Sequence, residues 1–485
     1  MAVTRLAARR LRPRTGWPVA VAVAVAACAD APEVVVPVID LPVGDPDATA
    51  AGLDAITLRV AHAGSDADLT SQTFARGAPL SLANVPFGDD LVIHMSGTIG
   101  ASNVAYGRTC TVAVTPGGTP PSPHLFFSRS VRFATLDATP VARLGGLGVD
   151  YLGTTILIGG DDANGAPVTA VERFDPATGR LGSLGQVSAR DRAVEALVGT
   201  AAQRVVVLGG AIGAAGATFV EVIDDRGIDR REIPQIARID LTATTLTDGR
   251  ALVAGGAAPD TNLPSAELDV VSDDGAAVDV RKLDATLRRA RAGHTATRLG
   301  DQVGAPVLIA GGVDAAGAPV ADAELFRPLS DDTLASFGPV MAIPRHRHAA
   351  AVMPDGSVLI IGGLDASGAS VRTLELFSVA GGFVPVGELP AGAGVVDFAA
   401  TTLPDGRILL TGGRATPTDP PLGTAYIARL DPRDGQIDLV TTDQMQVARA
   451  GHQATSLCDG TVLITGGALG PSPAERYNPP PLGRR

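Results

Sequence analysis

Short apolar runs alternate with turn residues along most of this chain, and the fifth of several repeats shows the pattern clearly. There, His348 to Met353 is a strand rich in small residues, Asp355-Gly356 follows, and the apolar run Val358 to Gly363 ends in Gly-Gly. Asp-Gly suits a type I′ hairpin turn, because both central residues of that turn need positive φ. Two further strands are expected at Leu374 to Phe377 and at about Phe383 to Val386.

Gly-Gly closes an apolar run seven times, with roughly 46 to 56 residues between successive first glycines. Such a period is typical of a propeller or solenoid array. A repeat of this kind predicts a scaffold and leaves the loops free, so it does not identify a ligand. The seven pairs are Gly159-Gly160, Gly209-Gly210, Gly255-Gly256, Gly311-Gly312, Gly362-Gly363, Gly412-Gly413 and Gly466-Gly467.

A glutamate follows the second glycine in six of the seven repeats, in the segment expected to form the third strand. In the sixth repeat Ile427 and Ala428 stand there instead. The glutamates are Glu172, Glu221, Glu267, Glu324, Glu375 and Glu475.

The apolar strand with Gly-Gly, the glutamate-bearing third strand and the period together resemble the kelch repeat, over roughly residues 131 to 478. The resemblance implies an all-β fold with a seven-bladed kelch-type β-propeller at residues 129–485. The usual fourth-strand tryptophan is missing, since the only tryptophan is Trp17 near the N-terminus. We expect three other side chains to pack in its place: Leu181, Phe337 and Phe383.

The seventh repeat runs out of residues after its third strand, Glu475 to Tyr477. It ends in three consecutive prolines, which cannot continue a sheet ladder. Just before the first repeat, Ser130 to Leu136 has the pattern of an unassigned strand. We expect this strand to lie beside the last blade, where it would close the ring and remove an exposed edge.

The first 27 residues have the features of an export signal: five arginines, then an apolar stretch from Trp17 to Ala27 that is too short to span a bilayer. The segment Val25 to Cys28 resembles the lipobox of bacterial lipoprotein signal peptides. That resemblance implies cleavage before Cys28 and lipidation of its sulfur, which would hold the chain on a membrane. The alternative is an ordinary signal peptide cut at the small residues, with Cys28 incidental.

Two regions are expected between the signal and the repeats. Residues 28–52, rich in Pro, Ala, Asp and Val, predict a flexible linker. Residues 53–128 predict a small β-sandwich, in which Leu82 to Gly88 resembles carboxypeptidase-regulatory or transthyretin-like modules. An immunoglobulin-like sandwich is the alternative. The strands expected there are Ile56 to Ala61, Pro79 to Val85, Leu91 to Met95 and Cys110 to Val114.

The composition of the 485 residues, with 58 glycines, 36 prolines and 19% charged residues, fits a turn-rich all-β protein. Removing the signal deletes five arginines and no acid, which takes the formal charge from -12 to about -17. Nucleic acid is not an expected partner, because phosphate contacts need clustered Lys and Arg. Cys110 and Cys458 fall in different expected domains and are predicted to be two separate thiols, with a bridge between them as the alternative.

An Arg-x-x-His motif recurs at the entry to the first strand of three repeats. By the kelch resemblance the first strand is innermost, so these side chains would ring one mouth of a central channel, where an anionic group could bind. The favoured alternative is that each arginine pairs with a third-strand glutamate and each histidine caps a turn, because the motif recurs with the repeat. Arg192 and Arg238 fill the arginine slot in two more repeats. The three motifs are Arg291/His294, Arg345/His348 and Arg449/His452.

No metal site and no cofactor are expected. The three histidines would be spread around a ring and could not all reach one zinc ion. Acidic loops after the double glycines, such as Asp314 to Gly317, lack the oxygen spacing of a calcium loop and are predicted to be turns. A galactose-oxidase-like copper centre would need a cysteine crosslinked to a tyrosine, whereas Cys458 falls in a hairpin turn and the chain has four tyrosines.

Together these features predict a lipid-anchored protein of the bacterial cell envelope, at the outer membrane or cell surface, that is not an enzyme and has no catalytic residue. Its expected partners are the membrane, through the lipid, and an unidentified protein or glycan bound by the propeller loops. The alternative is an enzyme that processes sugar acids at the channel mouth, similar to kelch-type sialic-acid mutarotases. The candidate residues for that activity are Arg291, Arg345, Arg449, His348 and Asp397.

Overall fold

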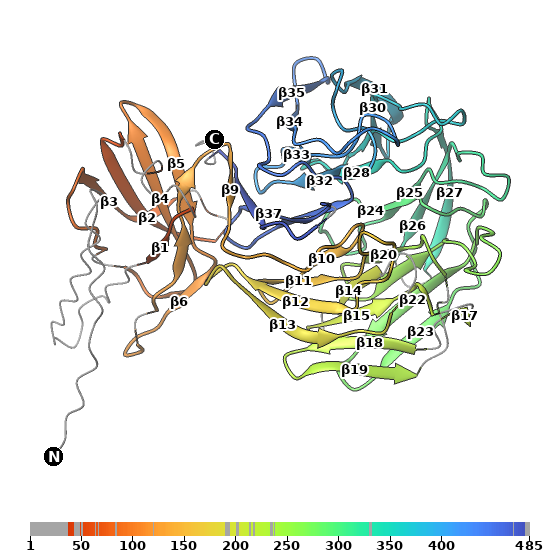
Figure 1. Ribbon diagram of the computed structural model, residues 1–485, viewed down its shortest axis with the longest axis horizontal. Helices are drawn as coiled ribbons and strands as arrows, with labels where there is room; N and C mark the ends of the chain where they lie inside the picture. Colours follow the sequence, from red (N-terminus) through yellow and green to blue (C-terminus); the bar gives the residue numbers. More distant parts are fainter. Residues whose placement is uncertain are drawn as a thin grey trace. The chain divides into compact units, whose positions relative to one another are not determined.

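The computed structural model describes residues 37–42, 49, 52–63, 65, 67–82, 85–119, 121–189, 195–199, 203–212, 215–216, 219–232, 236, 238–328, 332–468 and 470–480. The chain divides into two compact units, Met1–Ser130 with Pro480–Arg485, and Val131–Pro479. Every named element is a β-strand (Figure 1). Among the described residues, no helix has the length and apolar character to cross a membrane. Cys28, the export signal and most of the expected linker lie outside the described residues.

The first unit contains a six-stranded sheet in the order β3-β2-β4-β5-β8, with β6 pairing with β4, and a two-stranded parallel sheet of β1 and β7. Residues 78–82 form no strand, contrary to the strand expected from Pro79, which has no backbone N–H for a ladder. The strands are β1 (Val38–Asp40), β2 (Ala55–His62), β3 (Asp68–Ala75), β4 (Gly88–Ile99), β5 (Ser102–Arg108), β6 (Val112–Val114), β7 (His124–Phe126) and β8 (Ser128–Arg129).

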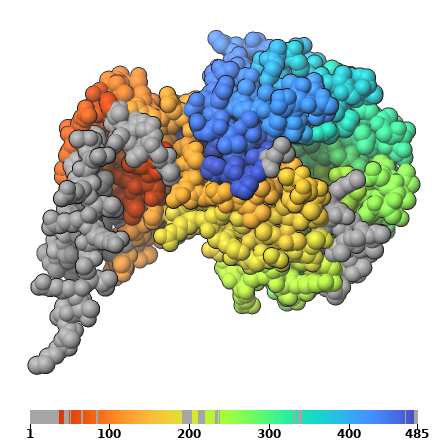
Figure 2. Space-filling view, viewed as in Figure 1, coloured from red at the N-terminus to blue at the C-terminus, as the bar shows by residue number. Residues whose placement is uncertain are grey.

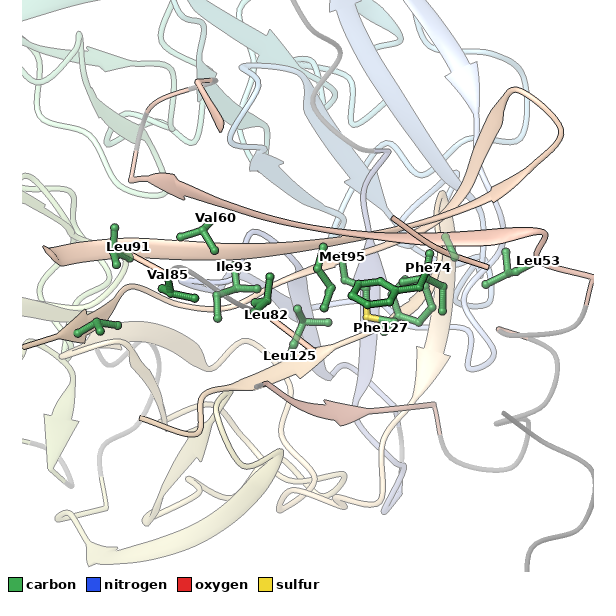
Figure 3. Close-up of a cluster of buried hydrophobic side chains, with 14 residues drawn as sticks. Leu53, Val60, Phe74, Leu82, Val85, Leu91, Ile93, Met95, Leu125 and Phe127 are labelled. Carbon is green, nitrogen blue, oxygen red and sulfur yellow. The ribbon is translucent and has the colours of Figure 1, made fainter. Parts of the chain in front are cut away.

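The core of the first unit lies on one face of the six-stranded sheet. Successive side chains of a strand point to opposite faces, and alternate residues of β2, such as Leu58 and Val60, are fully buried. Leu91 and Ile93 of β4 pack in the same cluster, and Leu125 from β7 packs against them (Figure 3). The two sheets are therefore held together by one apolar layer.

In the described part of the second unit, seven four-stranded antiparallel sheets follow one another along the chain. Within each of the first six sheets, the strands pair in the order in which they occur in sequence. In Figure 2 the surface of this unit passes through yellow, green and blue in sequence order. This topology is that of a β-propeller, in which each sheet is a blade.

The strands of the first four blades have the following bounds. They are β10 (Leu147–Tyr151), β11 (Thr154–Ile158), β12 (Ala170–Asp175) and β13 (Arg180–Gln186); β14 (Glu195–Gly199), β15 (Arg204–Leu208), β18 (Phe219–Asp224) and β19 (Gly227–Glu232); β20 (Thr242–Thr245), β21 (Ala251–Ala254), β22 (Leu268–Asp273) and β23 (Val278–Lys282); and β24 (Thr295–Arg298), β25 (Val307–Ala310), β26 (Asp322–Arg327) and β27 (Thr333–Val340). A short hairpin of β16 (Ala211–Ile212) and β17 (Ala215–Gly216) extends from the second blade.

The strands of the fifth and sixth blades are β28 (Ala349–Val352), β29 (Val358–Ile361), β30 (Thr373–Ser378) and β31 (Gly382–Glu388), then β32 (Ala399–Thr402), β33 (Ile408–Thr411), β34 (Ala425–Leu430) and β35 (Ile437–Thr441). The seventh blade contains β36 (His452–Ser456), β37 (Val462–Gly466), β38 (Glu475–Asn478) and, as its fourth strand, β9 (Arg132–Thr135).

The prediction of a closing strand from upstream is confirmed. Strand β9 pairs antiparallel with β38, and Phe133 stands opposite Tyr477 in the register. The two rings lie 4.9 Å apart between centroids, and Tyr477 is fully buried. Figure 1 shows the orange β9 among the blue strands from the end of the unit. The edge that β38 would otherwise expose is therefore covered.

The double glycines are explained by packing between neighbouring blades. A Cβ on Gly311 would lie 2.4 Å from the ring of His348 in the next blade, and a Cβ on Gly362 would lie 2.7 Å from the ring of Phe398. The second glycine, as in Gly363, leaves room for the Cβ of His348 at the start of its own blade. All of these glycines have positive φ, which favours residues without a Cβ. In these blades the first glycine thus makes room for the side-chain ring of a histidine or phenylalanine from the next blade.

The innermost strands are more exposed than the second strands of the same blades. The four residues of β20 and the four of β24 are all half-buried, on both faces of the strand. In contrast, the second strands β21 and β25 are buried at every residue. The first strands of the third to sixth blades are rich in Ala and Thr, so most of their side chains are small.

Candidate functional site

The repeated arginines lie inside the blades and bind the third-strand carboxylates. Burial lowers the pKa of Arg291, Arg345 and Arg449, and the paired glutamate opposes this shift in each case. In the third blade, Arg238 binds Asp269 at 2.6 Å and Glu267 at 3.0 Å. Arg192 lies outside the described residues. The other pairs are Arg143–Glu172 at 2.8 Å, Arg291–Glu324 at 2.9 Å, Arg449–Glu475 at 3.3 Å and Arg345–Glu375.

Each arginine also fixes the backbone around the double glycine. The Nη1 atom of Arg291 donates to the carbonyl oxygens of Gly311 and Asp322, at 3.2 and 2.9 Å. The carboxylate of Glu324 in turn accepts the backbone N–H of Arg288 at 3.0 Å. The ion pair therefore joins the loop that enters the blade to its second and third strands.

The motif histidines are packing residues rather than turn caps. His294 and His348 each share a hydrogen bond through Nε2 with a threonine at 3.0 Å, and His452 shares one with Thr411 at 2.8 Å. Burial, helped by the neighbouring arginine, lowers the pKa of each of these three histidines to about 3. They are therefore neutral at pH 7.

These contacts place all six candidate anion-binding residues in the scaffold. The three arginine side chains are fully buried, and none of the three histidines is more than 8% exposed. None of the six side chains is thus exposed to a ligand at the channel mouth.

A different set of residues lies at the entry to the first strands of the blades. One residue just before the first strand has positive φ in each of six blades, between 52° and 71°. Hydrogen bonds join neighbours in this set: Gly293 N donates to Asp240 O at 3.0 Å, and Gly451 N donates to Asp397 O at 2.7 Å. We call these six residues the mouth ring: Gly145, Asp240, Gly293, Arg347, Asp397 and Gly451.

Charged residues of the mouth ring form an accessible cluster in the fifth and sixth blades. Arg347 donates to Asp397 at 2.5 Å, and Arg414, the residue after the sixth double glycine, lies 3.8 Å from the same carboxylate. The side chains of Arg347, Asp397 and Arg414 are 43%, 29% and 25% exposed. Arg414 is held in place because its Nη1 donates to the carbonyl oxygen of Asp419 at 2.5 Å. Two guanidinium groups thus flank one carboxylate, next to solvent.

Of this cluster, the sequence analysis named only Asp397, and it missed Arg347 and Arg414. A signal was present: Arg347 stands where the first, fourth and seventh blades have Gly145, Gly293 and Gly451. A charged residue in a slot that other repeats fill with glycine departs from the repeat. The search for recurring residues passed over it for that reason.

The acidic loops after the double glycines have the hydrogen bonding of turns. The Oδ1 atom of Asp314 accepts the backbone N–H groups of Ala316 and Ala318, at 2.9 and 3.1 Å. Asp365 makes the same contacts with the backbone of Ser367 and Ala369. It also accepts the Ser367 hydroxyl at 2.7 Å, which is the largest cause of its lowered pKa, and the backbone bonds add to it. Among the residues that the structure describes, no group of three or more His, Cys, Asp or Glu is arranged to hold a metal ion.

The structure corrects the expectation of two separate thiols, because Cys110 and Cys458 are each disulfide-bonded. Disulfides form and persist in oxidising compartments and are rare in reducing ones.

No protein-family model matches the chain, and no curated protein matches it. Two solved structures are similar in fold. The structure of YjhT is 14% identical, with a TM-score of 0.48, over 63% of this chain and 99% of that one. A fungal alcohol oxidase of the AA5 family, in complex with copper, is 17% identical, with a TM-score of 0.51, over 73% of this chain and 76% of that one. The chain has a kelch-like, galactose-oxidase-like β-propeller fold.

The residues of this chain do not fit the copper of that oxidase. Cys458 is disulfide-bonded, so its sulfur cannot be crosslinked to a tyrosine. Tyr151 and Tyr477 are buried in apolar clusters of the propeller. The described part of the chain has no group of three or more His, Cys, Asp or Glu side chains beside them that could hold a metal ion. We therefore derive no chemical step through copper.

The prediction that this chain is not an enzyme is wrong in the light of the comparison, because the matched oxidase is an enzyme with the same propeller fold. The prediction assigned every recurring residue to the scaffold and then found no catalytic residue. A repeat specifies the scaffold and leaves the loops free to carry a function, so recurring scaffold residues do not exclude an enzyme.

Proposed function

We propose that this chain is an exported kelch-type enzyme that binds a sugar acid at the mouth ring and acts on it there. The observation that supports this most is the accessible cluster of Arg347, Asp397 and Arg414. It combines anion-binding groups with a proton acceptor, and all three side chains are partly exposed to solvent.

The backbone of the cluster argues for a role in function. Arg347 and Asp397 have φ of 52° and 56°, a conformation that side chains other than glycine adopt at a cost of about 1 kcal/mol or more. Glycine occupies the same ring position in three other blades, so the fold does not require a side chain there. Residues kept in such a conformation cluster at binding and active sites.

The chemistry of the cluster suits a ligand that carries a carboxylate and hydroxyl groups. A guanidinium binds a carboxylate through two parallel hydrogen bonds. A ligand carboxylate that binds Arg347 and Arg414 in place of Asp397 leaves the Asp397 carboxylate able to accept a hydrogen bond from a ligand hydroxyl. Opening the ring of a cyclic sugar needs a group that takes the proton of the anomeric hydroxyl while water returns one to the ring oxygen, so Asp397 is the proposed base.

Export and anchoring belong to the same proposal. The disulfide-bonded state of Cys110 and Cys458 supports an oxidising compartment. The lipobox-like segment before Cys28 suggests attachment to a membrane through a lipid on that sulfur. Cys28→Ser should move the chain from the membrane fraction to the soluble fraction of the cell envelope, and retention in the membrane would contradict the anchor.

The enzymatic part is tested with the purified chain and a panel of uronic and other sugar acids, by following anomer exchange with NMR. We expect faster exchange for at least one acid, and Asp397→Asn should remove the acceleration. Arg429→Ala is the matched control, because Arg429 forms an exposed ion pair with Asp438 at 3.2 Å on an outer part of the same blade. Failure of the wild type to bind any acid of the panel would overturn the proposal.

A further inference from the structure

Ser370, in the loop after the fifth double glycine, stands where four other blades have proline. In each of these five loops the next residue donates its backbone N–H to the carbonyl oxygen of the second glycine, as Val371 does to Gly363 at 2.9 Å. Proline has no backbone N–H, so the slot does not need one. Ser370 therefore interrupts the repeat, as Arg347 does in the same blade. The four prolines are Pro167, Pro264, Pro319 and Pro421.

The hydroxyl group of Ser370 reaches the sixth blade. Its Oγ atom is in a half-buried residue and donates to the carbonyl oxygen of Ala415 at 2.7 Å. Ala415 follows Arg414 and precedes a turn in which the N–H of Asp419 donates to the carbonyl oxygen of Thr416 at 3.2 Å. The carbonyl oxygen of Asp419 in turn accepts Nη1 of Arg414 at 2.5 Å. Hydrogen bonds thus connect Ser370, through this turn, to the guanidinium group of Arg414.

These bonds set the direction of the Arg414 side chain. The backbone N–H of Arg414 donates to the carbonyl oxygen of Val396 at 2.9 Å, which fixes only where the side chain begins. With Nη1 on the turn, the Nε atom lies 3.8 Å from Oδ2 of Asp397, the carboxylate that Arg347 also binds. A guanidinium group that is already oriented loses less conformational freedom when it binds a carboxylate.

We propose that Ser370 is a positioning residue of the proposed site, because its hydroxyl group holds the turn that orients Arg414 toward a ligand carboxylate. The inference rests on the proposed function, since Arg414 is one of the two arginines that bind this carboxylate. The bond from Ser370 also joins the fifth blade, which carries Arg347, to the sixth blade, which carries Arg414. It therefore fixes the two arginines relative to each other.

Calorimetry with D-glucuronate tests the role of the hydroxyl group. Ser370→Pro restores the residue of four other blades, and Ser370→Ala removes little more than the hydroxyl. Both variants should weaken binding by about threefold to tenfold, as expected for one lost hydrogen bond, and Ser370→Thr, which keeps the hydroxyl, should restore it. Ser370→Pro should melt no lower than the wild type, because proline restricts the unfolded chain. Ser367→Ala is the matched control and should leave the affinity unchanged, since that hydroxyl binds Asp365 within the same loop at 2.7 Å.

A second measurement follows Arg414 without a ligand. Its Nε–H signal in an NMR spectrum, assigned by its loss in Arg414→Lys, should be sharp in the wild type and in Ser370→Thr, and broadened or shifted in Ser370→Pro. If Arg414→Lys weakens binding while Ser370→Pro keeps both the signal and the affinity of the wild type, the inference about Ser370 is wrong and the proposed site stands. Failure of threonine to restore the affinity would also overturn it. If the wild type binds no sugar acid, the proposed function fails and this inference fails with it.

Discussion

Arg345 and Arg347 are two residues apart in one loop, and they have opposite environments. Arg345 is fully buried, binds Glu375 and recurs in other blades as Arg291 and Arg449. Arg347 is 43% exposed, binds Asp397 and stands where other blades have glycine. In this propeller the recurring charges therefore hold the blades together, whereas the charges that interrupt the repeat are the ones that a ligand can reach.

The largest expected effect is the loss of stability when a buried arginine is replaced, compared with an exposed one. Arg345→Met leaves Glu375 buried without its partner, which should lower the free energy of unfolding of the propeller by about 3 to 5 kcal/mol. Arg429→Met removes an exposed arginine from its pair with Asp438 and should change it by less than about 1 kcal/mol. Chemical denaturation of the three chains measures this. Equal stability of Arg345→Met and the wild type would show that the buried pair does not hold the blade.

Two glycines extend the comparison from charges to space. Gly311→Ala places a Cβ 2.4 Å from His348 at a φ of 67°, so the neighbouring blades must move apart, and we expect a loss of about 2 to 4 kcal/mol. Gly293→Ala has a similar φ, 61°, but no described atom within 4 Å, and should cost only about 1 kcal/mol. Thermal melting of both variants distinguishes them. Similar losses would contradict the assignment of Gly311 to blade packing.

The smallest effect concerns the buried histidines. The folded chain keeps His348 neutral down to a pKa of about 3, whereas an unfolded histidine takes up a proton near 6.5. Stability from this group is therefore present above pH 6.5 and is lost as the pH falls below it, by about 1.4 kcal/mol per pH unit. His348→Phe should reduce the slope of unfolding free energy against pH between pH 6.5 and 5 by that amount, because phenylalanine does not bind a proton. Phenylalanine should fit, because Phe398 fills the equivalent position of the sixth blade. An unchanged slope would show that His348 is not the group that takes up the proton on unfolding.

Much of the fold could be predicted from the sequence, because the double glycines and hairpin turns follow local rules that repeat. The closing strand β9 was predictable for a similar reason, since a blade with three strands leaves an edge open. The pairing of Arg291 with a third-strand glutamate was predicted because both residues recur with the repeat, and the ion pair with Glu324 confirms it. The role of His294 was not predicted, because its contact with Thr242 depends on how two neighbouring blades pack. Arg347 was missed because a repeat directs attention to what recurs. Alignment of the ring positions would have shown Arg347 opposite Gly145, Gly293 and Gly451.

We propose that Arg347 is kept for a ligand at some cost to the stability of the fold. Arg347→Gly tests both parts in one variant, with melting temperature and D-glucuronate binding measured on the same sample. The account predicts a melting temperature equal to or above that of the wild type, because glycine adopts a φ of 52° without strain, together with at least about tenfold weaker binding. A lower melting temperature with unchanged binding would contradict it and place Arg347 in the scaffold with Arg345.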